Sequence, residues 1–179
     1  MSIKENVIGF IFCRGGSKQI PRKNLMELAG KPLIAHSIDT AFDSQLVNRV
    51  IVSTDDEEIA EVAKKYGAEV PFIRPKALAQ DDSPEIAAWQ HAVKFVRCAD
   101  PKCFFDVFVS IPATSPLRDA SDIDSCIKLL QETSADLVVS LRQASRNPYF
   151  NMLEKDKQGR YRLLRTQNRP IVGRQYAPE

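Results

Sequence analysis

The chain has 179 residues, which is enough for one domain with a sizeable core and too few for two comfortable ones. Hydrophobic residues make up 44% of the sequence and charged residues 27%, which is typical of soluble globular proteins and argues against intrinsic disorder. The formal net charge is only +2, whereas nucleic-acid-binding proteins are usually more basic, so we expect no nucleic acid partner.

The first residues and the cysteines indicate the compartment. Residues 1–13 include Glu5 and pass directly into a strand pattern, and no stretch approaches about 18 consecutive apolar residues. We therefore expect no signal peptide, no membrane partner and a cytoplasmic protein. The cysteine spacing fits neither a paired zinc site nor a disulfide framework, so we expect four reduced thiols. The cysteines are Cys13, Cys98, Cys103 and Cys126.

Short β-branched apolar segments alternate along the chain with longer amphipathic ones. The short segments predict buried parallel strands at 6–12, 49–53, 69–73, 107–111 and 136–141. The longer segments predict helices at 31–42, 56–67, 83–96 and 121–132. The helix at 83–96 has Ser83 as its expected N-cap and Pro84 at its first position.

This βαβαβαβαβ order predicts an α/β fold, with a right-handed, doubly wound, mostly parallel sheet of the Rossmann-like type in residues 1–144. Residues 145–179 break the rhythm and form a separate segment of the same domain. Within this segment, residues 155–160 predict a hairpin turn with Gly159 at a positive φ. A two-stranded ribbon is marginal alone, so we expect this protruding hairpin to need a partner surface.

Polar loops follow the predicted strands, at the edge of the sheet where ligands bind in such folds. In the first loop, Gly15 and Gly16 allow backbone conformations closed to other residues, so successive amides could form an anion nest. Arg14 and Lys23 add positive charge. The loop matches neither a dinucleotide fingerprint nor a Walker A sequence, and a solvated basic turn is the alternative interpretation.

Five segments occur in an order and spacing that resemble the acylneuraminate cytidylyltransferases, also called CMP-sialic acid synthetases. They are RGGSKQIPRKN (14–24), LAGKPLIAHSI (28–38), VIVSTDDEEIAEVAKKYGAEVPFIRP (50–75), LAQDDSP (78–84) and ATSPLR (113–118). The resemblance implies a nucleotide-diphospho-sugar transferase type of fold. It also implies transfer of CMP from CTP to the anomeric hydroxyl of a sialic-acid-like, nine-carbon α-keto acid, with release of pyrophosphate and with Mg²⁺ as cofactor.

The resemblance also assigns roles to individual residues. It gives Arg14 and Lys23 catalytic roles at the triphosphate, and puts Asn24 on the cytosine or ribose. Gly15, Gly16 and Ser17 surround the triphosphate as well. Thr114 and Ser115, in the ATSPLR segment, are expected to contact the sugar.

Several positions carry two interpretations. Arg74 matches the family arginine near the nucleotide, but it could form a surface salt bridge. Ser83 falls near the family's ribose-contacting serine and is also the expected N-cap. Asp55 and Asp56 suggest a metal pair, although acidic residues at a helix start more often cap it, and we predict no metal-ligating residue in the chain. His36 and His91 are expected to pack rather than to act in catalysis.

The chain departs from the family in two places. Family members commonly have a glutamine where this chain has Pro112. The identity of the sugar substrate is therefore undecided, and a legionaminate-type acid is as plausible as N-acetylneuraminate. Family chains also continue into further core strands and an Asp-x-Asp segment that binds Mg²⁺. Since this sequence stops at Glu179, either it is a fragment or its metal site is incomplete.

In the family, the hairpin segment extends into a second subunit, so the resemblance implies a homodimer. Its basic residues are then candidates for binding the sugar carboxylate of the neighbouring site, with an exposed basic hairpin as the alternative. These candidates are Arg162, Arg165, Arg169 and Arg174.

Three functional hypotheses remain. The first is a cytidylyltransferase, and the second is a related sugar nucleotidyltransferase that uses another base or a Kdo-type acid. The third is a nucleotide-binding or assembly module without turnover, which the missing C-terminal strands would explain. Binding of CTP without turnover would separate the third hypothesis from the first.

Overall fold

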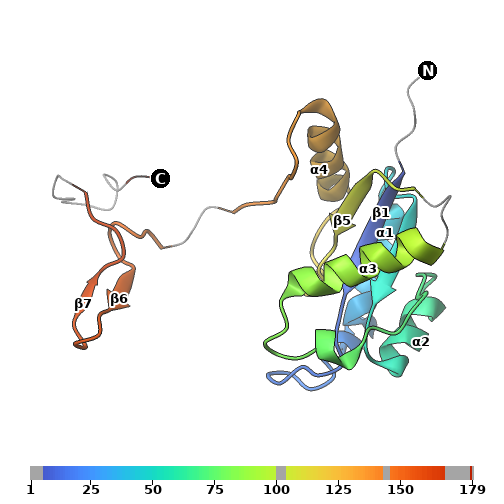
Figure 1. Ribbon diagram of the computed structural model, residues 1–179, viewed down its shortest axis with the longest axis horizontal. Coiled ribbons are helices and arrows are strands. Elements are labelled where there is room, and N and C mark those ends of the chain that lie inside the picture. Colours follow the sequence, from blue (N-terminus) through green and yellow to red (C-terminus); the bar gives the residue numbers. More distant parts are fainter. Residues whose placement is uncertain (1–5, 100–103, 143–145, 168–177, 179) are drawn as a thin grey trace. The chain divides into compact units, whose positions relative to one another are not determined.

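The computed structural model describes residues 6–99, 104–142, 146–167 and 178. The chain divides into two compact units, Met1–Val138 and Val139–Glu179 (Figure 1). The division predicted from the sequence, after residue 144, falls a few residues later. Within the described residues, no helix is long and apolar enough to cross a membrane.

A parallel three-stranded sheet forms the centre of the first unit. Its order is β4-β1-β5, with β1 at Val7–Phe12, β4 at Arg49–Ser53 and β5 at Val107–Ser110. The central strand pairs with both neighbours in parallel, and Phe10 lies opposite Ile51 on one side and Ser110 on the other. The carboxyl ends of the three strands therefore meet at one edge of the sheet, as the sequence predicts.

The predicted helices are all present, with small shifts at their ends. They are α1 (Leu33–Asp43), α2 (Glu57–Lys65), α3 (Glu85–Ala99) and α4 (Ala120–Glu132). Two 3₁₀ turns, η1 (Lys23–Leu25) and η2 (Lys76–Leu78), lie in the loops. The start of the segment predicted as the first helix instead pairs as β3 (Lys31–Pro32) with β2 (Glu27–Leu28).

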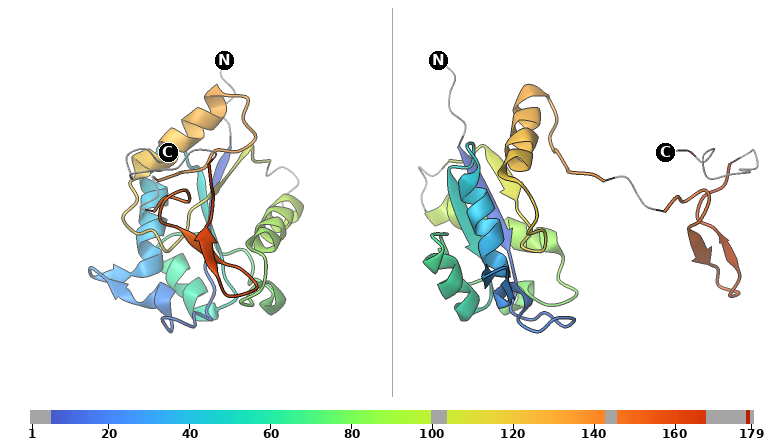
Figure 2. Two further views of the ribbon diagram at one scale, coloured as in Figure 1. Left: turned by 90° about the vertical axis from the view of Figure 1, so that its left-hand side faces the viewer. Right: turned by 180° about the vertical axis from the view of Figure 1, so that it is seen from behind.

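Helices cover both faces of the sheet, which confirms the doubly wound α/β arrangement. Alternate residues of β1 point to opposite faces, so Val7 and Ile11 pack with the apolar residues of α1, α2 and α4. Ile8 and Phe10 pack on the other face, with the buried residues of α3. In the left-hand view of Figure 2, α3 accordingly lies across the sheet from α1.

Two of the predicted strands are wrong. Residues 69–73 run beside β4, but only a single bridge joins Ile51 to Glu69. Pro71 lacks the amide hydrogen that a continuing ladder needs, and Phe72 instead packs in the core beside α3. Residues 136–141 form no strand, and Leu137 and Leu141 are 73% and 90% exposed.

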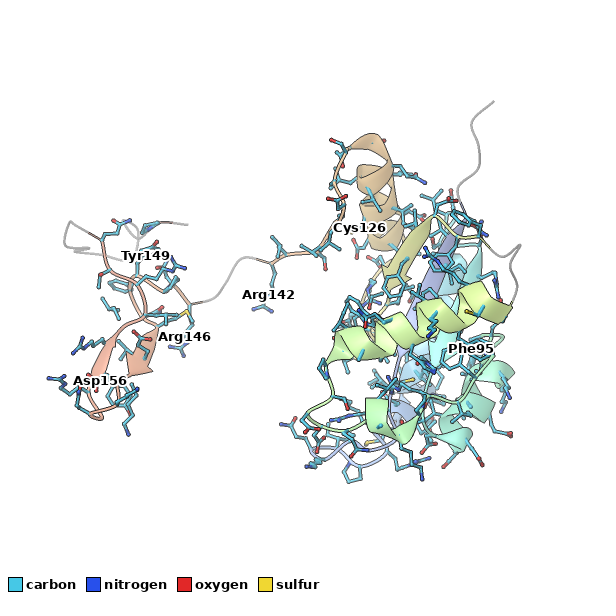
Figure 3. All side chains as sticks on the ribbon, viewed as in Figure 1. Phe95, Cys126, Arg142, Arg146, Tyr149 and Asp156 are labelled. Atoms are coloured by element: carbon cyan, nitrogen blue, oxygen red, sulfur yellow. The ribbon has the colours of Figure 1, made fainter. Side chains whose placement is uncertain are left out.

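The second unit contains the predicted hairpin. Strands β6 (Leu153–Lys155) and β7 (Tyr161–Leu163) pair antiparallel, and Gly159 in the turn has φ 82°, as predicted. Asp156 closes the turn (Figure 3), because its carboxylate accepts hydrogen bonds from the backbone amides of Gln158 and Arg160, both at 2.9 Å.

The cysteines that the structure describes are free thiols. Cys13 is buried at the end of β1, while Cys98 is exposed and Cys126 is half-buried. Burial raises the pKa of Cys13 to about 12, so this thiol stays protonated at neutral pH. Cys103 lies outside the described residues.

Candidate functional site

The loop that follows β1 is held at three consecutive residues by side chains from three other segments. Nη2 of Arg74 donates to the carbonyl oxygen of Cys13 at 3.0 Å. Nδ2 of Asn24 donates to the carbonyl oxygen of Arg14, also at 3.0 Å. The amide of Gly15 donates to Oδ1 of Asp55 at 3.1 Å. The loop therefore begins from a fixed backbone at the carboxyl end of the central strand.

Arg74 is buried rather than exposed, so its interpretation as a surface salt bridge is wrong. Only 5% of the residue is accessible, and burial is the main cause that lowers the pKa of its guanidinium. Nη2 lies 3.8 Å from Oδ1 of Asp55, and Nε is buried without a hydrogen-bond partner among the described residues. A buried charge is costly unless an opposite charge lies nearby, and for Arg74 the carboxylate of Asp55 supplies that charge.

The two glycines have a different role from the predicted one. Neither has a positive φ, so the expectation of an unusual backbone conformation is wrong. Gly15 is required for space, because a Cβ there would lie 3.0 Å from both Cβ and Cγ of Asp56. Gly16 has open space around it. Two amides of the predicted anion nest already have acceptors, since Gly15 donates to Asp55 and Ser17 donates to the Gly15 carbonyl oxygen at 3.0 Å.

Most cations of the loop are paired with carboxylates of this same unit. Arg14 lies 2.7 Å from Asp81, and Lys18 pairs with the same carboxylate. Lys18 is the main cause that lowers the pKa of Asp81, to which Arg14 also contributes. Lys23 is half-buried at the start of η1 and makes no ion pair with the residues that the structure describes.

Arg22 closes the loop by binding the start of α2. Its guanidinium contacts Oδ2 of Asp56 at 2.5 Å and also pairs with Glu58. Asp56 caps α2, because its Oδ1 accepts the amide of Ile59 at 3.0 Å. The hydrogen bond from Arg22 is the main cause that lowers the pKa of Asp56. No sequence pattern indicated that Arg22 pairs with Asp56 or that Asp81 pairs with Arg14, since both pairs join loops that are distant in the sequence.

Asp55 and Asp56 do not form a metal pair in this structure. Asp56 caps the helix, as the alternative interpretation predicted, and Asp55 accepts the Gly15 amide. Among the described residues, no group of three or more histidine, cysteine, aspartate or glutamate side chains is arranged to hold a metal ion.

Ser83 does not act as the predicted N-cap. Helix α3 begins at Glu85, and the Ser83 hydroxyl accepts from the amide of Gln80 at 3.1 Å and donates to the carbonyl oxygen of Ala77 at 2.9 Å. Ser83 therefore stabilises the turn around η2. Contact with a ribose stays a prediction.

The loop after β5 is anchored to α1 through Pro112. Its carbonyl oxygen accepts from the Ser37 hydroxyl at 3.2 Å and from Nη2 of Arg118 at 3.4 Å. Thr114 and Ser115 are exposed beyond this anchor. Their hydroxyls are available for a ligand, and their contact with the sugar stays a prediction.

Of the hairpin arginines, Arg162 and Arg165 lie in the described second unit. Arg162 pairs with Asp156 at 3.4 Å, and the amide of Arg165 donates to the carbonyl oxygen of Pro148 at 3.0 Å. Arg165 lines a hollow of this unit with Tyr149, Leu164 and Thr166. Arg169 and Arg174 lie outside the described residues.

Both histidines are engaged within the fold. Nε2 of His36 lies 2.7 Å from the carbonyl oxygen of Leu28, and the His91 ring meets Phe72 edge-on at 4.9 Å between centroids. Nδ1 of His91 is buried without a hydrogen-bond partner among the described residues. That neither histidine acts in catalysis stays a prediction.

Comparison with known proteins identifies relatives along most of the chain. A family model described as cytidylyltransferase matches residues 8–168. A pseudaminic acid cytidylyltransferase of Campylobacter jejuni is 46% identical over 104 residues, which cover 58% of this chain and 44% of that protein. A CMP-N,N'-diacetyllegionaminic acid synthase of Legionella pneumophila is 38% identical over 144 residues, covering 79% and 60%. The chain thus spans between about two fifths and three fifths of the length of these relatives.

Solved structures support the fold. A CMP:2-keto-3-deoxy-manno-octonic acid synthetase complexed with CTP superposes with a TM-score of 0.62 at 20% identity, covering 73% of this chain and 49% of that one. A 4-diphosphocytidyl-2C-methyl-D-erythritol synthase gives a TM-score of 0.59 at 11% identity, with coverages of 81% and 67%. These similarities confirm the Rossmann-like α/β fold expected from the sequence.

Proposed function

Because the chain belongs to the cytidylyltransferase family, we propose that its protein transfers CMP from CTP to a sialic-acid-like, nine-carbon α-keto acid. The names of the relatives support pseudaminic or legionaminic acid as the sugar, alongside N-acylneuraminic acid. A CTP-dependent reaction on a free sugar acid fits a cytoplasmic enzyme.

The main observation in support of this proposal is the basic loop between β1 and η1, whose backbone is held in place at the carboxyl end of β1. Arg74, Asn24 and Asp55 fix the start of the loop, and the loop and η1 present Arg14, Lys18, Arg22 and Lys23. In open α/β sheets, ligands bind at this edge. Three of these cations are paired with carboxylates in the structure, and Lys23 has no ion pair among the described residues. An unpaired cation at a fixed backbone, beside cations that can exchange a carboxylate for a phosphate, suits a triphosphate, because phosphoryl transfer needs mainly positioning and neutralisation of charge.

The reaction forms a bond between the anomeric oxygen of the sugar and the α-phosphorus, and it breaks the bond between that phosphorus and the bridging oxygen. Pyrophosphate leaves with the electron pair, and the hydroxyl proton passes to solvent or a base. Lys23, the loop cation without an ion pair among the described residues, would hold the triphosphate. Arg14 would join it by exchanging Asp81 for a phosphate. Lys23 and Arg14 are thus the proposed catalytic residues.

Mg²⁺ is part of the proposal only as the Mg–CTP complex. The residues that the structure describes do not fit a metal site of their own, because Asp55 and Asp56 are engaged by Gly15, Arg22 and the start of α2. Mg²⁺ commonly binds through substrate phosphates and water with one or two carboxylates, so such a complex needs few protein ligands.

Two measurements test the proposal on the purified chain. Calorimetry with Mg–CTP tests binding, and release of pyrophosphate with each of the three sugar acids tests turnover and names the substrate. We expect CTP to bind. Binding without turnover would favour the alternative of a nucleotide-binding module. Absence of CTP binding would contradict the proposed function.

A further inference from the structure

The carboxylate of Asp81 holds two cations of the loop after β1 at the same time. Its Oδ1 lies 2.7 Å from Nη2 of Arg14, and its Oδ2 pairs with Nζ of Lys18. Among the described residues, this carboxylate has no other hydrogen-bond or ionic partner. It therefore differs from the carboxylate of Asp56, which binds Arg22 and also caps α2.

The turn that carries Asp81 is held by hydrogen bonds of its own. The Ser83 hydroxyl accepts from the Gln80 amide at 3.1 Å and donates to the carbonyl oxygen of Ala77 at 2.9 Å. The side-chain amide of Gln80 donates to the carbonyl oxygen of Lys76 at 2.7 Å. On the other side of the ion pairs, residues 18–22 of the loop are exposed. The turn thus keeps its shape without the ion pairs, and the two cations can leave it for another anion.

We propose that Asp81 is an internal substitute for phosphate, which occupies Arg14 and Lys18 while the site is empty and which an arriving polyphosphate must displace. The two cations already converge on one anion through separate oxygens, as cations do around a phosphate group. This inference rests on the proposed function, because it concerns the same triphosphate site. It gives Asp81 a regulatory effect, since the residue lowers the affinity of the site for polyphosphate.

Electrostatics sets the direction and the size of this effect. A polyphosphate that binds at Arg14 and Lys18 must break both ion pairs and is also repelled by the carboxylate of Asp81. Removing the negative charge of Asp81 should therefore tighten binding. The gain should be modest, because the Asp81 side chain is 40% exposed and ion pairs in contact with solvent are weak. If Asp81 instead served to aim the two cations at the ligand, its removal would weaken binding.

Calorimetry with inorganic tripolyphosphate tests the direction, because this ligand shares the phosphates of CTP but has no base or ribose. Asp81→Asn should bind tripolyphosphate about 3-fold more tightly or more, the effect of no longer breaking the exposed ion pairs. Asp82→Asn is the matched control, because this neighbouring carboxylate is exposed and makes no ion pair with the residues that the structure describes. An unchanged or weaker affinity of Asp81→Asn, or an equal gain in Asp82→Asn, would overturn the proposal.

A double-mutant cycle tests whether Asp81 acts through the loop cations. Lys18→Gln removes one of the two ion pairs, so the gain from Asp81→Asn should be smaller in this background than in the unmodified chain. An undiminished gain would mean that Asp81 acts only by repelling the phosphates, and this result would overturn the proposed displacement.

The ion pairs are also tested without any ligand. Lys18 is the main cause that lowers the pKa of the Asp81 carboxyl, and Arg14 also lowers it. In Lys18→Gln, the pKa of Asp81 measured by carbon-13 NMR should therefore rise towards its ordinary value of 3.8. An unchanged pKa would overturn the proposal, whether or not a polyphosphate binds. If the unmodified chain binds neither CTP nor tripolyphosphate, the proposed function fails, and this titration still decides whether Asp81 holds the loop cations.

Discussion

Gly15 and Asp56 lie so close together that no side chain fits between them. A Cβ on Gly15 would stand 3.0 Å from both Cβ and Cγ of Asp56, and nearer still to its Oδ2. Asp56 cannot easily move away, because it caps α2 through Ile59 and is bound by Arg22. The close approach joins the loop after β1 to the loop after β4.

Gly15→Ala should therefore displace the loop or the start of α2. We expect it to lower the free energy of unfolding by about 1–3 kcal/mol, as overpacking usually does, and to weaken CTP binding. Gly16→Ala is the matched control, because the space around Gly16 is open. Chemical denaturation and calorimetry of both variants check this. Equal effects of the two substitutions would contradict the steric argument.

Lys23→Ala should weaken CTP binding or turnover by about 10-fold or more, because a hydrogen bond between a charged donor and a phosphate contributes roughly 1.5–3 kcal/mol. Lys94→Ala, an exposed lysine on α3, controls for the loss of one positive charge. Calorimetry with CTP and the rate of pyrophosphate release provide the two readouts. An unchanged affinity together with an unchanged rate would exclude a direct role for Lys23.

The site should prefer CTP over UTP. The two bases differ at position 4, where cytosine has an amino donor and uracil a carbonyl acceptor, so a site that pairs one leaves a buried group unpaired with the other. Competition of UTP against bound CTP measures this preference. If UTP displaced bound CTP as effectively as unlabelled CTP does, the result would argue against a cytidylyltransferase and for a nucleotidyltransferase of broader specificity.

The ion pair between Arg22 and Asp56 should stabilise the fold at neutral pH and not in acid. Arg22 lowers the pKa of Asp56 below its ordinary value of 3.8, so the contribution is present above that value. It disappears as the pH falls through the lowered pKa of the folded state. Because the Arg22 side chain is 43% exposed, we expect no more than about 1 kcal/mol.

Thermal unfolding of an Arg22→Gln variant checks this pH dependence. Its Tm should lie below that of the unmodified chain at pH 7, and the difference should shrink in strong acid. Lys94→Gln should show no such trend. A Tm difference between Arg22→Gln and the unmodified chain that stays constant with pH would rule out the ionised Asp56 as its source.

The protein should form a homodimer through its second unit. The hairpin exposes apolar side chains that a second copy could bury across a two-fold axis. These are Phe150, Met152, Leu153, Tyr161, Leu163 and Leu164. Light scattering should therefore report a dimer at micromolar concentration. Leu153→Glu and Tyr161→Glu should shift it to monomer, whereas Leu117→Glu, at a 94% exposed position of the first unit, should not.

A monomeric unmodified chain would refute this dimer. If the dimer forms and the arginines of one copy reach the site of the other, Arg165→Ala should raise the KM for the sugar more than it weakens CTP binding.

The sequence by itself determined the three strands of the parallel sheet, the four helices and the edge of the sheet where the polar loops meet. Strands at β1, β4 and β5 and the four helices follow from local apolar patterns, which depend only on neighbouring residues. Parallel strands then bring their polar loops to one edge. The hairpin turn followed from Gly159, because its positive φ is a local requirement.

Only the tertiary structure decided how the loops contact one another. The burial of Arg74 under Cys13, the clearance between Gly15 and Asp56, and the pairing of Asp81 with Arg14 join residues that lie 41 or more positions apart. Local patterns contain no information on such contacts. Tertiary pairing likewise decided that residues 69–73 form a single bridge and not a strand, because a strand exists only where a neighbour supplies its hydrogen bonds.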